Sequence, residues 1–319
     1  MDISAIVMYL GFVLAAYSVV GNDTIQTLGT FLSSNERKKW WVLWLFAGGI
    51  LSITLIIGYI NYNGDVSYGR LEKYPLPDPF AWYFLLPPVI LMLLTRTGIP
   101  VSTSFLILTF FNPENLNKMV LKSVSGYAVA FGAAIVLYLA ISKILERKFI
   151  ENPITRRQTE VWTALQWGST GFLWSQWLIQ DFANIYVYLP RNLNGWQLAL
   201  SLVVLLGLLA YIIATRGGAI QNIVRSKTNT VDIRSATIID FAYGIILFFF
   251  KELNNVPMST TWVFIGILAG REIAINFMLR KKENRKAMFR NLGMDLVKVI
   301  IGLIVSIVLV YMVRYLAAR

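Results

Sequence analysis

Four stretches of this sequence carry no charged residue over about the length that crosses a lipid bilayer. They are residues 40–60, 123–142, 161–180 and 192–215. A helix of roughly 20 apolar residues spans the hydrocarbon core of a membrane. Only 14% of the 319 residues are charged, against roughly a quarter in soluble domains. The chain is therefore predicted to be an all-α integral membrane protein with several spans.

The charged and reactive residues exclude several classes of protein. The net charge is +12, but the basic residues gather at the ends of the apolar segments, as in the positive-inside rule, so we expect no nucleic-acid partner. The chain has no cysteine and no histidine, which excludes disulfides and thiolate or imidazole metal sites. A lipid-modifying enzyme would need a nucleophile–base pair or a metal cluster. We therefore predict no enzyme and no cofactor.

Two sequence motifs each occur twice. The polar stretch GNDTIQTLG returns as IQDFANIYV, and the stretch IPVSTSF returns as VPMSTTW. Asp23 and Asp181 lie 158 positions apart, and the two Pro-x-Ser-Thr motifs lie 157 apart. A common offset for unrelated motifs is the signature of an internal duplication. We predict a first repeat at residues 1–150 and a second at residues 151–319.

The basic loops predict the orientation of the chain in the membrane. Residues 35–39, 143–160, 216–235 and 271–290 are rich in Lys and Arg, so they belong in the cytoplasm. Residues 61–79 hold more acidic than basic side chains and belong outside. These positions place the N-terminus outside the cell. The predicted location of the protein is the cell (inner) membrane.

The same positions require two segments that do not cross the membrane. Residues 80–112 must enter and leave on the outer side, and residues 236–271 on the inner side, as re-entrant hairpins. Each repeat then crosses three times, so the two repeats are inverted relative to each other. If every apolar run crossed instead, the basic loop 143–160 would lie outside. Six full spans are predicted, at residues 4–34, 40–60, 118–142, 161–190, 195–215 and 287–315.

Polar residues interrupt the first and fourth predicted spans. We expect these helices to break near Asn22–Asp23 and Gln180–Asp181. Inside a bilayer an ionised carboxylate needs a partner, and side-chain oxygens are the ligands that hard cations such as Na⁺ prefer. Two alternatives stay open: the carboxylates hydrogen-bond within the bundle for packing, or they carry H⁺ as the coupling ion. The predicted Na⁺ ligands are Asn22, Asp23, Gln26, Gln180, Asp181 and Asn184.

The second motif predicts the anion site. Proline ends a helix, and nearby hydroxyls can satisfy the freed backbone groups. Backbone N–H groups and hydroxyls at the start of a half-helix also form a neutral cradle for an oxyanion, as in secondary transporters built from inverted repeats. The plainer alternative is that the hydroxyls cap helices and that Arg96 pairs with Glu252 or Asp240. The predicted substrate ligands are Ser102, Thr103, Ser104, Ser259, Thr260, Thr261 and Arg96.

With these motifs the sequence resembles the inorganic phosphate transporter (PiT) family of Na⁺- or H⁺-coupled symporters. That family carries two inverted copies of a Gly-Ala-Asn-Asp-Val-Ala-Asn-Ala-like signature, each followed by a Leu-Pro-Val-Ser-Thr-Thr-His-like hairpin. VGNDTIQTLGTFLSSN and IQDFANIYVYLP resemble the signatures, and GIPVSTSF and VPMSTTW resemble the hairpins. The matching signature positions are Asn22, Asp23, Gly29, Thr30, Ser34, Asp181, Asn184 and Pro190.

The resemblance implies that the Asp and Asn clusters bind a cation and that the hairpin hydroxyls bind an oxyanion. The chain departs from the family where Phe105 and Trp262 replace His, and where Gln26 and Gln180 replace Asn. We predict a Na⁺-coupled symporter of a small inorganic oxyanion, with phosphate favoured and a homodimer left open. The alternatives are a permease for sulfate or another small anion, an H⁺-coupled symporter, or an anion channel.

Overall fold

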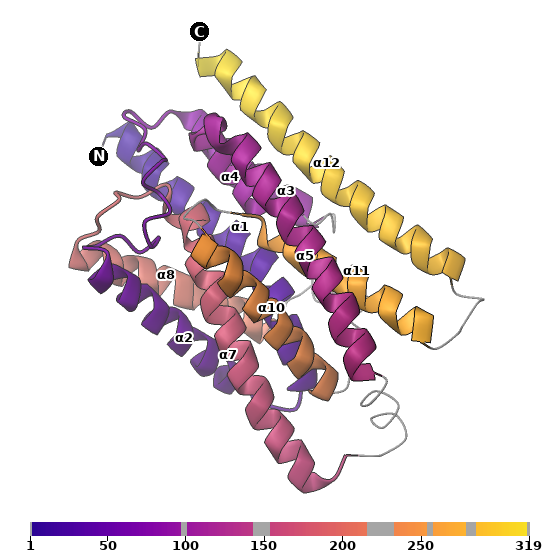
Figure 1. Cartoon of the computed structure of the whole chain (residues 1–319). Coiled ribbons are helices and arrows are strands. Elements are labelled where there is room, and N and C mark those ends of the chain that lie inside the picture. The colour runs from indigo at the N-terminus through magenta and orange to yellow at the C-terminus, as the bar shows by residue number, and fades with distance from the viewer. Residues whose placement is uncertain are drawn as a thin grey trace.

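The fold is a bundle of long helices (Figure 1). The structure is a computed structural model that describes residues 2–96, 101–142, 154–215, 233–253, 258–278 and 285–317. Within these residues no β-strand is formed. The helices are α1 (Ile3–Ser34), α2 (Trp40–Asn61), α3 (Leu86–Arg96), α4 (Thr103–Phe111), α5 (Leu116–Ser142), α7 (Arg156–Tyr186), α8 (Gly195–Ala214), α10 (Ile233–Leu253), α11 (Thr260–Met278) and α12 (Arg285–Ala317), with short 3-10 helices η1 (Trp82–Leu85) and η2 (Pro113–Asn115).

Five of the described helices are long and apolar enough to cross a membrane, and they correspond to five of the six predicted spans. They are α1, α2, α5, α8 and α12. The sixth predicted span is α7, whose 31 residues are long enough to cross at 1.5 Å per residue. Three of its glutamines, Gln166, Gln176 and Gln180, are buried, because α7 packs against α1, α2 and α10. The chain is an all-α, multi-pass membrane protein.

The predicted helix breaks are wrong. α1 runs unbroken through Asn22 and Asp23, and α7 runs unbroken through Gln180 and Asp181. The amide nitrogen of Asn22 donates to the Asp23 carboxylate at 2.7 Å and to the carbonyl of Val101 at 3.3 Å. Because these groups bond to each other and to a neighbouring element, they do not compete for the backbone hydrogen bonds of their own helix.

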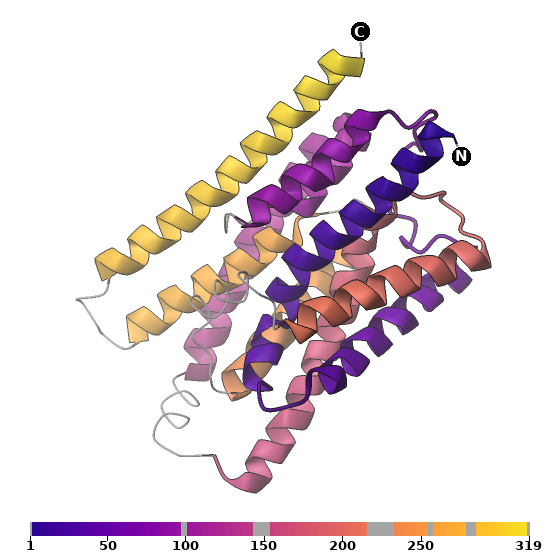
Figure 2. The same ribbon diagram turned by 180° about the vertical axis from the view of Figure 1, so that it is seen from behind.

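Helices α3 and α4 form one hairpin, and α10 and α11 form a second; the two hairpins open on opposite sides of the bundle. The start of α3 and the end of α4 lie on the side that carries both chain termini, whereas the start of α10 and the end of α11 lie on the other side (Figures 1 and 2). The apolar parts of α3 and α10 are shorter than the spans. This arrangement agrees with the two predicted hairpins, although α11 extends beyond residue 271. Pro100 and Pro257, at the expected tips, lie outside the described residues.

The two hairpins contact each other through a reciprocal pair of hydrogen bonds. The Ser104 hydroxyl donates to the Met258 carbonyl at 3.3 Å, and the Thr261 hydroxyl donates to the Val101 carbonyl at 3.4 Å. Residues 101 and 104 of the first hairpin correspond to residues 258 and 261 of the second under the 157-residue offset. Each bond is therefore the counterpart of the other, as for contacts related by a two-fold axis. This symmetry supports an internal duplication. The division between residues 150 and 151 lies outside the described residues and stays a prediction.

Glycine allows α11 to approach α5 closely. A Cβ atom at Gly266 would lie 2.6 Å from the carbonyl oxygen of Tyr127, and one at Gly270 would collide with the carbonyl oxygen of Phe131. Small residues four positions apart let helix backbones come together in membranes, where van der Waals packing supplies much of the association energy. The second hairpin is therefore held on α5 by backbone-to-backbone contact.

We expect Gly270→Ala to destabilise the protein by about 1–3 kcal/mol, because the backbone of α5 cannot yield as a side chain can. The greater helix propensity of Ala works in the opposite direction. Unfolding of the purified protein in detergent measures the change. The matched control is Gly132→Ala on α5, where an added Cβ meets no atom within 4 Å. Equal stability of the two variants would show that this packing tolerates a methyl group.

Candidate ion and substrate site

Two carboxylates far apart in the sequence lie close together inside the bundle. Asp23 on α1 and Asp181 on α7 are both 0% exposed, and they interact electrostatically. Asp23 accepts hydrogen bonds from the amides of Asn22 at 2.7 Å and Gln26 at 3.4 Å, and Asp181 accepts one from Asn184. Two buried carboxylates repel each other, so their ionised forms require a compensating positive charge nearby.

Several oxygen atoms of this cluster have no hydrogen-bond donor. A buried acceptor without a partner is costly and rare in folded proteins. Oxygen ligands without competing donors are what a hard cation such as Na⁺ requires. No group of three or more acidic, His or Cys side chains occurs in the described part of the chain, so a multi-carboxylate metal centre is not indicated there. Among the described residues, the buried oxygens without a partner on α1 and α7 are Asp23 Oδ2, Thr24 Oγ1, Gln176 Oε1, Gln180 Oε1, Asp181 Oδ2 and Asn184 Oδ1.

The first hairpin reaches this carboxylate pair through Thr103. The Thr103 hydroxyl donates to Asp181 at 3.4 Å and accepts from the Asn184 amide at 3.1 Å. Its side chain is also within hydrogen-bonding reach of Asp23. From the second hairpin, the Thr260 side chain lies near Asp181. Thr103 and Thr260, two of the predicted anion residues, therefore lie beside the predicted cation residues Asp181 and Asn184.

Ser102 is the N-cap of α4, and Ser259 caps the start of α11; these are the second helices of the two hairpins. The Ser102 oxygen accepts from the backbone N–H of Phe105 at 3.2 Å, and the Ser259 oxygen accepts from that of Trp262 at 3.3 Å. This is the plainer role that the sequence left open, and such caps stabilise helix starts. A hydroxyl that accepts a hydrogen bond can still donate its own proton. Capping and substrate binding are therefore compatible at these two residues.

The hairpin contact is enclosed by aromatic side chains. Phe105 and Trp262, which occupy equivalent positions, pack edge to face with ring centroids 5.6 Å apart. The hydroxyl residues beside them are 5% exposed or less. The cluster is therefore closed to solvent in this conformation. The six buried hairpin residues are Ser102, Thr103, Ser104, Ser259, Thr260 and Thr261.

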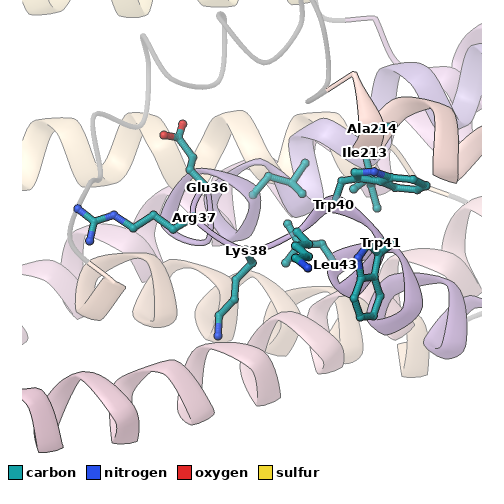
Figure 3. Close-up of a pocket in the computed structure, with 10 residues that line it drawn as sticks. Glu36, Arg37, Lys38, Trp40, Trp41, Leu43, Ile213 and Ala214 are labelled. Atoms are coloured by element: carbon teal, nitrogen blue, oxygen red, sulfur yellow. The ribbon is translucent and has the colours of Figure 1, made fainter.

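Two surface pockets among the described residues lie away from this cluster. One, of about 490 Å³, is formed by the turn between α1 and α2 together with the end of α8. Figure 3 shows the charged side chains Glu36, Arg37 and Lys38 on one side of this turn and the indoles of Trp40 and Trp41 on the other. Basic and tryptophan side chains at a helix end are typical of a membrane interface. This pocket does not reach the buried cluster.

The outcome for the remaining predicted residues is mixed. Gln180 is buried and its amide donates to the Leu247 carbonyl at 3.4 Å. Asp240 accepts from Thr30 at 2.6 Å and from Thr170 at 2.5 Å, so it joins α10 to α1 and α7. α3 ends at Arg96. The Arg96 side chain lies outside the described part of the structure, so its predicted contacts stay untested.

Sequence reasoning missed two buried basic residues, Arg70 and Lys122. Arg70 lies in the loop between α2 and η1, and Lys122 lies on α5; they are 3% and 8% exposed. Lys122 had a detectable signal, because it is a charge inside the predicted span 118–142. Arg70 had none, because an arginine in a polar outer loop is ordinarily solvated.

A comparison with solved structures finds the same arrangement of helices. A structure described as "The sodium-dependent phosphate transporter" aligns over 99% of this chain and 100% of its own, with a TM-score of 0.63. The two chains share a fold. Their sequences are 16% identical, and at that level the likeness concerns the fold alone. No protein-family profile and no curated protein sequence matches the chain.

Proposed function

We propose that this protein is a secondary transporter that couples the movement of Na⁺ to that of a small inorganic oxyanion, with phosphate as the favoured substrate. The observation that carries the proposal is the buried pair Asp23 and Asp181, each of which has one carboxylate oxygen without a partner and lies beside a threonine from a hairpin helix. The fold shared with a sodium-dependent phosphate transporter supports the same reading.

The mechanism follows from the charges and the symmetry of the site. Na⁺ held by the carboxylates would neutralise their mutual repulsion and leave the hairpin hydroxyls facing a less negative environment. An oxyanion could then bind where Thr103, Thr260 and the two cap serines converge. Because the hairpins open on opposite sides, small rigid movements of one hairpin against the other would expose the site to each side in turn.

Uptake into proteoliposomes tests this proposal. We expect radiolabelled phosphate to accumulate under an inward Na⁺ gradient and not under an inward K⁺ gradient. Sulfate and bicarbonate are measured in parallel, and a proton gradient replaces the Na⁺ gradient in a further set. Accumulation of sulfate alone would change the substrate, and accumulation driven by protons would change the coupling ion. Flux that follows the anion gradient with no cation dependence would identify a channel.

We also propose the cell (inner) membrane with the N-terminus outside, because the turn containing Arg37 and Lys38 is basic. The chain has no native cysteine, so single cysteines report position without background. A membrane-impermeant thiol reagent should label Glu114→Cys, in η2, from the outside of intact cells. It should label Lys38→Cys only after the membrane is opened. The reverse pattern would invert the proposed orientation. Homodimerisation stays a prediction.

A further inference from the structure

The pocket beside the turn between α1 and α2 lies where two membrane-spanning helices end. α2 begins at Trp40 and α8 ends at Ala214, and both helices are long and apolar enough to cross a bilayer. Helices of that length end at the level of the lipid headgroups. The pocket therefore opens at the membrane surface, where phospholipid molecules as well as water can enter it.

This pocket combines a basic rim with an apolar floor. Three basic side chains, Arg37, Lys38 and Lys39, line it together with the acidic side chain of Glu36. A positive rim above an apolar floor matches a molecule with an anionic head and an apolar tail. The floor consists of apolar side chains that are 7% exposed or less, and they are Leu32, Leu43 and Ile213.

Hydrogen bonds hold the walls of the pocket in place. The Asn35 amide donates to the side chain of Gln166 on α7 at 3.0 Å, and the Asn35 carbonyl accepts from the backbone N–H of Lys38 at 2.9 Å. On the other wall, the Trp44 indole donates to the Leu206 carbonyl at 3.0 Å and fixes α2 against α8. The cavity is therefore preformed, and its volume of about 490 Å³ lies within the range of roughly 300–1,000 Å³ for small-molecule sites.

The corresponding turn of the second predicted repeat has no basic cluster. It joins α7 to α8, and α8 begins with a capping box formed by Asn194 and Gln197. Within residues 187–194 only Arg191 is basic, and its guanidinium donates to backbone carbonyls. The repeated fold therefore requires a turn at this place but not three adjacent basic side chains. The positive-inside rule accounts for basic residues in a cytoplasmic turn, but not for a cavity beside them.

We propose that this pocket binds an anionic phospholipid. Arg37, Lys38 and Lys39 hold the phosphate of the headgroup, since a guanidinium donates two parallel hydrogen bonds to phosphate and lysines add point charges. The first part of an acyl chain lies on the apolar floor, between Trp41 and Ile213. Basic pockets between membrane helices recognise anionic headgroups in this way. The inference does not depend on the transported substrate, so it stands or falls separately from the proposed function.

Competition between phospholipids on the purified full-length protein tests this site. Native mass spectrometry counts the lipids retained from an equimolar mixture of phosphatidylglycerol and phosphatidylcholine. We expect phosphatidylglycerol to be retained in preference, and its affinity to fall about 10- to 50-fold in the double variant Arg37→Gln, Lys38→Gln, which loses two basic side chains. The matched control, Arg156→Gln with Arg157→Gln, removes the same charge from exposed positions at the start of α7 and should change nothing.

Two outcomes of this competition would overturn the proposal. Equal retention of the two lipids by the wild type would show that the pocket does not select an anionic headgroup. Equal losses of affinity in the two double variants would show a general attraction of basic side chains to anionic lipid, with no site at the turn.

A further variant tests the cavity without changing the charge. Ala214→Phe adds a ring among the residues that line the pocket, so it should also weaken the binding of phosphatidylglycerol. If this variant binds the lipid as the wild type does, the cavity plays no part and the proposal fails. Displacement of the lipid by millimolar inorganic phosphate would identify a site for free phosphate instead of lipid.

Basic residues also direct the insertion of a chain into the membrane, so the orientation of each variant is checked. The Glu114→Cys label, introduced into each variant, reports whether the orientation is kept. A double variant that inserts the other way round is set aside, and Ala214→Phe, which keeps every basic side chain, then decides alone.

Discussion

Asp23→Asn and Asp181→Asn are each expected to abolish Na⁺-driven uptake while leaving the protein folded. Each replacement keeps the shape of the side chain but removes one of two buried negative charges. Breaking a buried charge pair costs about 3–5 kcal/mol, so the apparent Na⁺ affinity should fall roughly 100- to 3,000-fold. The two carboxylates also repel each other less after the change, which favours folding and separates the loss of transport from a loss of stability.

Asp240→Asn provides the matched control for these variants. Asp240 is equally buried on α10, but both of its carboxylate oxygens accept hydrogen bonds, from Thr30 and Thr170. We expect Asp240→Asn to lower the melting temperature in detergent and to leave the Na⁺ dependence of uptake intact. Unchanged Na⁺ dependence in both the Asp23 and the Asp181 variants would exclude a cation role for the pair.

The second large effect is expected at the two serine caps. Ser102→Ala and Ser259→Ala should each raise the apparent Kd for the oxyanion about 10- to 150-fold, because a hydrogen bond to a charged ligand is worth roughly 1.5–3 kcal/mol. If both hydroxyls donate to one bound anion, their effects should couple in a double-mutant cycle. Equilibrium binding of phosphate to the two single variants and the double variant gives the coupling energy.

A cap with no substrate role distinguishes the two functions of these serines. Thr155 caps α7 through its hydroxyl and is exposed, far along the helix from Asp181. Thr155→Ala should cost about 1 kcal/mol of stability, as other lost caps do, without changing the Kd. If Ser102→Ala and Ser259→Ala behave like Thr155→Ala, with additive losses of stability and unchanged affinity, the serines are caps alone.

The sequence by itself determined which segments are apolar enough to enter the membrane, and it predicted that the two hairpins open on opposite sides. Both follow from local composition, because a bilayer sorts each segment by its hydropathy and by the Lys and Arg at its ends. It also identified Asp23 and Asp181, since a carboxylate in an apolar segment stands out whatever surrounds it. The offset of the repeated motifs needed no structure either.

Tertiary structure alone decided how these parts meet. Thr103 and Asp181 are 78 positions apart, yet they hydrogen-bond, and no local pattern predicts that pairing. α1 and α7 continue through their polar residues because neighbouring elements supply the partners. Arg70 looked like a solvated loop residue until the fold buried it. Hydropathy is a property of each segment separately. Burial and hydrogen bonding depend on which segments pack together, and this packing is decided only when all the helices assemble.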